Sequence, residues 1–131
     1  MKIFLIILLF ISFNVTFAQS ETPGTNDTRP EEIRGTWIID LRPTPDAENY
    51  FKEFVIEKLD GKSFSGKFYD TDFENGQLNL DWGIVYFAFT TKDASNSYFH
   101  SGYFEGNKVF GISYSPERKF TLPWTGEKKN K

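Results

Sequence analysis

Side chains that could carry chemistry are few in this chain. It has one histidine, His100, and no cysteine, so it does not supply the usual ligand set of a zinc site. Ser101 follows His100 directly, but neighbours on a β-strand point to opposite faces, so this pair does not form a nucleophile and its base. We therefore expect no enzymatic activity; an unrecognised activity centred on His100 is the alternative.

An acidic run has part of the spacing of a calcium-binding loop. Asp70, Asp72 and Glu74 alternate with other residues, and Asp81 stands at the twelfth place. The glycine that such a loop needs at its sixth place is replaced by Asn75, so a solvated turn is the better interpretation. The chain also lacks the glycine-rich loop that holds phosphates. We expect no metal and no cofactor.

The first eighteen residues have the features of a secretory signal peptide. Lys2 precedes an apolar run over 3–13, and Thr16-Phe17-Ala18 has the small residues that precede a cleavage site. The run is shorter than the roughly 20 residues of a spanning helix, although an uncleaved anchor is the alternative. The sequence predicts an exported, soluble protein, periplasmic or extracellular, that begins near Gln19.

Composition divides the remainder into three parts. Residues 19–34 and 127–131 are mostly polar, which predicts a flexible leader and a polar tail. The part between them, 35–126, holds most of the aromatic residues and forms the predicted domain. The mature chain is mildly acidic and has no basic stripe, which argues against nucleic acid and against anionic membranes as partners.

The domain shows turn residues every eight to twelve positions and no long helical period, which predicts an all-β fold. Tight turns are expected at Asp60-Gly61, Asn75-Gly76 and Gly106-Asn107. Closure into an eight-stranded antiparallel meander barrel would remove both open edges, and a two-sheet sandwich is the alternative. The predicted strands are 35–42, 50–59, 62–70, 76–80, 82–91, 97–105, 108–114 and 118–126.

Several short motifs resemble those of the calycins, the family of lipocalin and avidin-like barrels. They are Gly35-Thr36-Trp37 with Leu41, the segment 64–69, the segment 80–86, and Ser101-Gly102-Tyr103. The resemblance implies that Trp37 packs across the closed end of a barrel. It does not imply biotin, because the polar biotin-binding positions of the avidin group hold Ile39, Pro43, Phe68 and Asp70 here. One position of a biotin-wall Trp holds His100, and only Trp82 matches.

The register transferred from this resemblance, with strand alternation, predicts which residues face the barrel interior. The inward set is Trp37, Ile39, Leu41, Phe64, Phe68, Asp70, Trp82, Ile84, Tyr86, Tyr98, His100, Phe104, Phe110, Ile112, Tyr114, Phe120, Leu122 and Trp124. Aromatic walls with a few polar groups are typical of ligand pockets, with Asp70 as the polar anchor. The candidate ligand-binding residues at the open end are Asp70, Trp82, Tyr86, Tyr98, His100 and Tyr114.

Two interpretations of this barrel follow. The first is an exported, non-enzymatic barrel that binds a small, partly apolar molecule at its open end. The second is a secreted or periplasmic protein-binding module, such as an inhibitor, on a barrel filled by its own aromatic residues; tyrosines at the mouth would then simply face water. Strand 82–91 is apolar on both faces, so its outer face is also a candidate contact for a homo-oligomer.

Overall fold

The computed structural model describes residues 28–131; the predicted signal peptide, 1–18, lies outside them. A short 3-10 helix and nine strands make up the described chain, and it contains no α-helix. None of the described segments is a helix long and apolar enough to cross a membrane. The elements are η1 (Pro30–Ile33), β1 (Gly35–Asp40), β2 (Phe51–Asp60), β3 (Ser63–Phe68), β4 (Thr71–Asp72), β5 (Glu74–Asn79), β6 (Val85–Lys92), β7 (Ser97–Glu105), β8 (Lys108–Ser115) and β9 (Phe120–Lys128).

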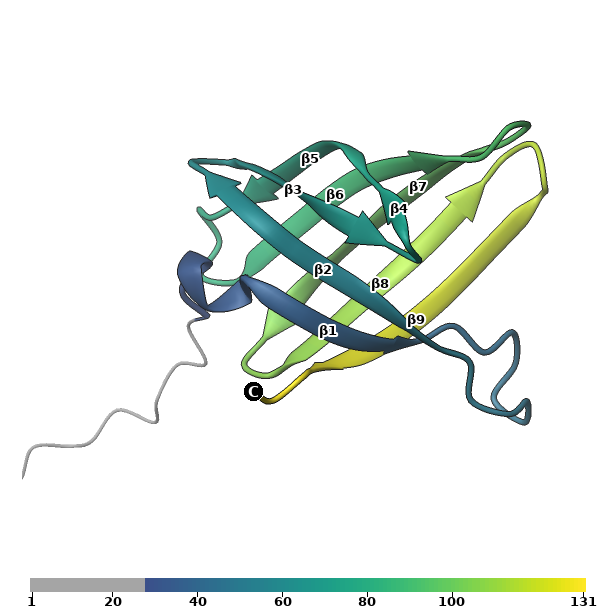
Figure 1. Cartoon of the computed structure of the whole chain (residues 1–131), viewed down its shortest axis with the longest axis horizontal. Coiled ribbons are helices and arrows are strands. Elements are labelled where there is room, and N and C mark those ends of the chain that lie inside the picture. Colours follow the sequence, from purple (N-terminus) through teal and green to yellow (C-terminus); the bar gives the residue numbers. More distant parts are fainter. Residues whose placement is uncertain (1–27) are drawn as a thin grey trace, which may run out of the picture.

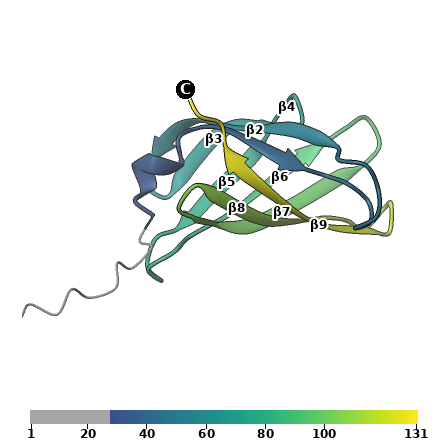
Figure 2. The same cartoon turned by 90° about the horizontal axis from the view of Figure 1, so that it is seen from below.

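The strands form a closed antiparallel barrel. Pairing runs in the order β2-β1-β9-β8-β7-β6-β5-β3, and a β2–β3 pairing closes the ring (Figure 1). The two-residue strand β4 pairs with β3 only, so eight strands make the wall. Seen from below, β9 runs obliquely across the near side of the barrel toward β1, with which it pairs (Figure 2). The predicted eight-stranded meander is confirmed, and the sandwich is wrong.

Of the three predicted tight turns, Gly106-Asn107 is confirmed, and the turn predicted at Asp60-Gly61 lies one residue later, at Gly61-Lys62, because Asp60 pairs with Ser63. Gly61 and Gly106 have φ values of 57° and 59°, and each lies in the turn of a hairpin. Such left-handed backbone matches the twist of the two strands that a short hairpin joins.

The predicted turn at Asn75-Gly76 is wrong. Asn75 has a φ of 57° but lies within β5, where the register with β6 shifts between Glu74 and Gln77. The segment is therefore a bulge. Gly76 is needed there because a Cβ would lie 2.1 Å from the carbonyl oxygen of Phe64.

The hairpin turn that follows β3 lies earlier, at Tyr69-Asp70, whose φ values are 54° and 61°. Phe68 pairs with Thr71 across it. Neither turn residue is a glycine, so sequence pattern favoured the later Asn-Gly pair. This turn ends β3 at Phe68 and carries Asp70 out of the strand.

Residues 28–34 differ from the predicted flexible leader. Thr28 is buried and its Oγ1 accepts a hydrogen bond from the backbone N–H of Gly106 at 3.0 Å. Ile33, the one apolar side chain of the leader, is fully buried, and its carbonyl oxygen accepts a hydrogen bond from Trp37 Nε1 at 2.8 Å. Helix η1 thus closes one end of the barrel. The burial of Ile33 and these hydrogen bonds offset the entropy cost of ordering the segment.

The closed end is completed from the other terminus of the domain. β9 continues to Lys128, beyond the predicted boundary at residue 126. The Lys128 ammonium lies 5.6 Å from the centre of the Trp37 ring and donates to the carbonyl oxygen of Glu32. Trp37 is fully buried beneath this contact, so it packs across the closed end as the resemblance implied.

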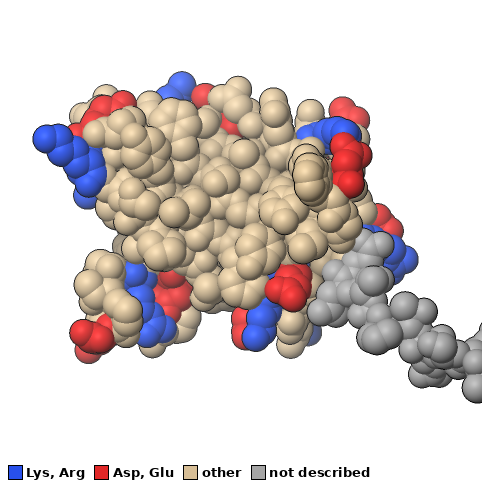
Figure 3. Space-filling view, turned by 180° about the vertical axis from the view of Figure 1, so that it is seen from behind, with Lys and Arg blue, Asp and Glu red and all other residues tan. Residues whose placement is uncertain are grey.

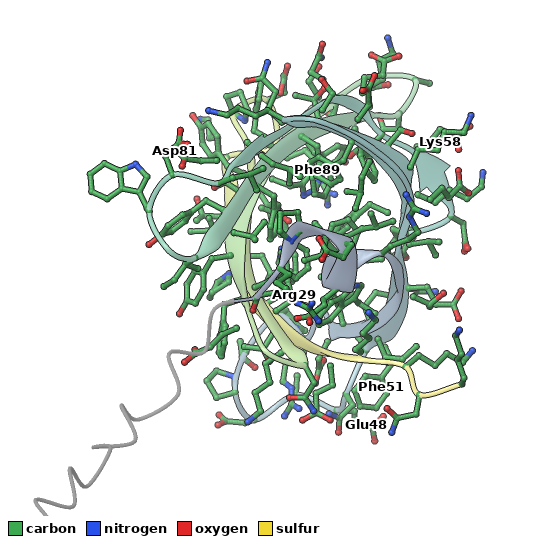
Figure 4. All side chains as sticks on the ribbon, turned by 90° about the vertical axis from the view of Figure 1, so that its left-hand side faces the viewer. Arg29, Glu48, Phe51, Lys58, Asp81 and Phe89 are labelled. Carbon is green, nitrogen blue, oxygen red and sulfur yellow. The ribbon has the colours of Figure 1, made fainter. Side chains whose placement is uncertain are left out.

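The half of the barrel above Trp37 is filled by aromatic rings. Phe54 lies at their centre and contacts rings from β3, β6, β7 and β9, with centroid distances of 5.2 to 6.2 Å. Figure 4 looks from the closed end and shows Phe89 inside the ring of strands, whereas Lys58 and Asp81 point away from it. Each buried ring removes a large apolar area from water, so this cluster stabilises the fold without disulfides.

Candidate functional site

The open end of the barrel contains a cavity of about 580 Å³. It lies where β1, β3, β6 and β8 end and where β2, β7 and β9 begin, which is the end that the sequence predicted for a site. Most of its wall is apolar or aromatic. The residues that line it are Leu41, Pro43, Tyr50, Phe68, Tyr69, Thr71, Thr91, Lys92, Asp93, Tyr98, His100, Ser113, Arg118, Phe120 and Leu122.

His100 lies in the wall of this cavity and is 4% exposed. Its ring packs against Phe68 and Phe89, with centroid distances of 4.4 and 4.7 Å. Its Nδ1 is 2.7 Å from Ser113 Oγ, and its Nε2 is 2.8 Å from Thr91 Oγ1. Burial lowers the pKa of His100 to about 4, because the charged ring would lose its hydration.

Ser113 connects the histidine to the aromatic core. Its Oγ accepts a hydrogen bond from Trp124 Nε1 at 2.9 Å and also contacts His100. A hydroxyl can donate and accept at once, so Ser113 and Thr91 together satisfy both nitrogens of a neutral histidine ring. Among residues 28–131, no buried side-chain nitrogen or oxygen lacks a partner. His100 is therefore held in one orientation.

The mouth of the cavity carries a second set of hydrogen bonds. Asp93 accepts from the backbone N–H groups of Ser95 and Asn96, both at 2.8 Å, and from Tyr98 Oη at 2.9 Å. These bonds hold the pKa of Asp93 below its usual range, the backbone donors having the largest effect. Arg118 Nη1 then donates to Tyr98 Oη at 3.2 Å.

Arg118 stands at this mouth and is linked to the Asp93 carboxylate through the Tyr98 hydroxyl; contact with Tyr98, and to a smaller extent the charge of Asp93, raises the pKa of Arg118. Its guanidinium lies 5.5 Å from the centre of the Phe120 ring and 6.0 Å from that of Tyr98. Within the described chain it has no acidic partner at ion-pair distance, whereas Lys92 pairs with Glu74 at 3.4 Å. Arg118 therefore has hydrogen-bond donors available to a ligand.

Tyr98 and His100 are the two predicted site residues that the structure places in the cavity wall. Their ring centres are 6.5 Å apart, and both face inward from β7 as predicted. The other four candidates lie elsewhere. Asp70 is exposed in the Tyr69-Asp70 turn, so it is not a buried anchor, and Trp82 is 76% exposed in the connection before β6.

Tyr86 lies outside the barrel because β6 faces the opposite way from the prediction. Val85, Phe87 and Phe89 point inward, not Trp82, Ile84 and Tyr86. Both faces of this strand are apolar, so alternation alone did not select one. Phe87 and Phe89 fill the core, and as a pair they are bulkier than Tyr86 and Ala88 on the other face. Trp82 and Ile84 precede β6, which begins at Val85, and Gly83 between them has a φ of 73°.

Tyr114 lies outside for a different reason. On β8 the inward positions are Val109, Gly111, Ser113 and Ser115, not Phe110, Ile112 and Tyr114. The limited volume beside Trp124 explains which face of β8 points inward, because a Cβ on Gly111 would lie 2.2 Å from the Trp124 ring. Small residues are needed opposite this tryptophan, so the apolar face of β8 is its outer face.

Sequence reasoning missed eight polar residues of the cavity: Tyr50, Tyr69, Thr71, Thr91, Lys92, Asp93, Ser113 and Arg118. Thr91 and Ser113 are small polar residues in otherwise apolar strands, and their inward position follows only once the register is known. Asp93 stands in the connection between the predicted strands 82–91 and 97–105. No pattern distinguishes Arg118 from other surface arginines.

A second hollow, of about 520 Å³, lies on the outside of β1, β8 and β9. Asp40 in its wall already accepts hydrogen bonds from Arg42 Nε at 2.8 Å, Asn49 Nδ2 at 2.7 Å and Tyr50 N at 3.0 Å. These bonds hold the pKa of Asp40 well below its usual range, Arg42 having the largest effect. The carboxylate therefore organises the connection between β1 and β2. Among the described residues, no three His, Asp or Glu side chains are arranged to hold a metal ion.

Comparisons of the chain with protein families, with curated proteins and with solved structures found no match. The barrel geometry is compatible with a calycin-like fold.

Proposed function

We propose that this protein is an exported, calycin-like barrel that binds a small, mainly apolar molecule in its open-end cavity and catalyses no reaction on it. The observation that carries the proposal is the cavity itself. About 580 Å³ remains hollow at one end, although aromatic rings fill the other half of the barrel. This volume lies within the range of sites for small molecules.

The walls indicate how such a molecule would lie. Leu41, Phe120 and Leu122 offer an apolar surface to the body of the ligand. The guanidinium of Arg118 is at the mouth, where its N–H groups that do not contact Tyr98 could donate to a ligand acceptor group; the Tyr98 hydroxyl already donates to Asp93. A ligand with an apolar body and a polar end fits both regions.

Binding without catalysis is supported by the state of His100. Both of its nitrogens are engaged by hydroxyl groups, and its low pKa keeps the ring neutral at physiological pH. Ser113 already accepts from Trp124, and its histidine neighbour is fixed by packing. The histidine is thus better suited to ordering the cavity wall than to proton transfer.

The test uses anilinonaphthalene sulfonate, a fluorescent probe with an apolar body and an anionic end. Leu41→Trp places a large ring in the cavity wall, and Val55→Trp adds the same ring on the outside of β2 as the matched control. We expect probe binding to weaken at least tenfold in Leu41→Trp and to stay unchanged in Val55→Trp. Equal affinity in all three proteins would place the probe elsewhere and overturn the proposal.

Native mass spectrometry supplies an independent measurement. Protein secreted by its host and purified without denaturation should carry a non-protein adduct, which the Leu41→Trp variant should lose. An adduct that persists in this variant would exclude the cavity as its site.

A further inference from the structure

The polar groups at the inner boundary of the cavity form one connected hydrogen-bond network. We name it the Thr91 network; it joins Trp124, Ser113, His100 and Thr91, in that order, by contacts of 2.9, 2.7 and 2.8 Å. The four residues come from β9, β8, β7 and β6, which are consecutive strands of the wall. Phe89, two residues before Thr91 on β6, belongs to the aromatic core, whereas Thr91 lines the cavity. The network therefore runs from the core to the cavity.

The Thr91 network contains more donor protons than contacts. The indole of Trp124 has one N–H and no acceptor, each hydroxyl has one proton, and a neutral imidazole has one N–H. Four protons are therefore available for three contacts, and each contact uses one. One donor proton is left over, whichever nitrogen of His100 carries the hydrogen. Protonation of the ring would add a further donor, so the surplus does not depend on the charge of His100.

The tautomer of His100 decides which hydroxyl keeps the surplus proton. A hydrogen on Nδ1 would donate to Ser113, and the Ser113 proton would then have no acceptor. Ser113 is 4% exposed, and among residues 28–131 its hydroxyl has hydrogen-bond partners only in His100 and Trp124. An unused donor is costly at such a buried position, so we assign the hydrogen of the ring to Nε2. Ser113 then donates to Nδ1, Nε2 donates to Thr91, and Thr91 keeps the surplus proton.

Thr91 presents this proton to the cavity. It is half-buried, and it lies on the same side of β6 as Phe87 and Phe89. Within the described chain its hydroxyl has no hydrogen-bond partner besides His100. The neighbouring Thr90, by contrast, donates to the carbonyl oxygen of Glu74 at 3.2 Å. Every bond of the network points the same way, from Trp124 toward the cavity, and bonds arranged in this way strengthen one another.

We infer that the ligand of this cavity carries an acceptor oxygen of the carbonyl type, to which Thr91 donates a hydrogen bond. The inference rests on the proposed function, because it names the class of molecule that the same cavity binds. A carbonyl oxygen accepts and has no proton of its own, so it uses the surplus donor without needing another acceptor. A hydrocarbon would leave the donor unused, which costs affinity. Thr91 therefore determines specificity for ketones and esters over hydrocarbons of the same shape.

The test compares two probes of nearly identical shape. 2-Acetylnaphthalene has a carbonyl oxygen where 2-isopropenylnaphthalene has a methylene group, so only the ketone can accept a hydrogen bond. Their affinities are measured by displacement of anilinonaphthalene sulfonate from the unmodified protein, from Thr91→Val and from Thr121→Val. Thr91→Val removes the hydroxyl at nearly constant volume. Thr121→Val is the matched control, because Thr121 is exposed on the outside of β9, on the side of the barrel where charged groups lie only around the border (Figure 3).

We expect Thr91→Val to bind the ketone roughly fivefold more weakly and the alkene with unchanged affinity. Thr121→Val should bind both probes as the unmodified protein does. Thr91→Ser retains a hydroxyl and should keep the affinity for the ketone. A general disturbance of the cavity wall would alter the affinity for both probes alike, so the ratio of the two affinities isolates the hydrogen bond.

The contrary outcomes separate the inference from the proposed function. If Thr91→Val weakens both probes equally, or neither of them, the inference is overturned while binding in the cavity stands. If neither probe displaces anilinonaphthalene sulfonate from the unmodified protein, the proposed function fails and the inference fails with it.

Infrared spectra of the bound ketone give a measurement that keeps Thr91 in place, should Thr91→Val not fold. The carbonyl band, isolated with a ¹³C label, should lie below its frequency in hexane, because a donated hydrogen bond weakens the carbonyl bond. The shift should persist in Arg118→Met, which removes the arginine donors at the mouth. A band at the hexane frequency in Arg118→Met would show that Thr91 donates nothing to the ketone.

Discussion

The buried histidine predicts a specific dependence of stability on pH. His100 has an ordinary pKa of 6.5, and burial lowers it to about 4 in the folded protein. The unfolded chain therefore binds a proton at a pH where the folded protein does not. Protonation of His100 in the unfolded chain therefore lowers the free energy of unfolding. This free energy is highest above pH 6.5 and decreases as the pH falls from 6.5 to 4.

The magnitude follows from the two pKa values. Their difference corresponds to roughly 3 kcal/mol of unfolding free energy, and about 2 kcal/mol of it is lost between pH 7.5 and pH 5. His100 is the one histidine in the chain, so it dominates the pH dependence of stability between pH 7.5 and pH 5. Asp40 and Asp93 also have lowered pKa values, but carboxylates affect stability mainly below about pH 5.

The assay is urea unfolding followed by tryptophan fluorescence at several pH values between 7.5 and 5. The unmodified protein should lose about 1 kcal/mol per pH unit near pH 5.5, whereas His100→Gln should show almost no slope. The variant is expected to be less stable throughout, because Ser113 and Thr91 lose a ring partner. The slope is therefore compared, not the level.

Parallel pH curves for the two proteins would refute the reasoning, because the histidine would then titrate alike in both states. A nuclear magnetic resonance titration of the folded protein gives a direct check. The His100 ring signals should not shift between pH 7.5 and pH 5.5, since the folded ring stays neutral there.

Three further substitutions test the packing around this site. Gly111→Ala should destabilise the fold by about 1–3 kcal/mol in urea unfolding, because the added Cβ meets the Trp124 ring; a neutral result would mean that the ring moves away freely. Ser113→Ala should cost about 1–3 kcal/mol, since it removes the shared partner of His100 and Trp124; an unchanged melting temperature would show that water replaces the hydroxyl. Trp37→Ala should cost about 3–5 kcal/mol by loss of the fully buried ring at the closed end, and a smaller loss would mean that this end collapses around the gap.

Prediction from sequence succeeded where a local pattern had one structural solution. The Gly106-Asn107 turn is confirmed because its glycine adopts a positive φ between two clear strands. Trp37 is confirmed at the closed end, and Tyr98 and His100 are confirmed as inward residues of β7. On β7 only one face combines large aromatic residues with a histidine that needs partners.

Prediction failed where a local pattern had two solutions. The outward Tyr86 and Tyr114 were placed inside because β6 and β8 carry apolar residues on their outer faces. Asp70 was predicted to face inward as part of a strand over 62–70. The turn at Tyr69-Asp70 contains no glycine, so the turn was predicted at Asn75-Gly76 instead. A shift of one residue moves every side chain of a strand to the other face.

The sequence by itself determined the all-β class and the number of strands in the wall, because strand patterns and turn residues depend on a few neighbours in the chain. Only the tertiary structure decided which face of β6 and β8 fills the barrel. It also brought Thr91, His100 and Ser113 together from three strands. That choice depends on the available volume, because a Cβ at Gly111 would lie 2.2 Å from the Trp124 ring, and this volume is set by residues distant in the sequence.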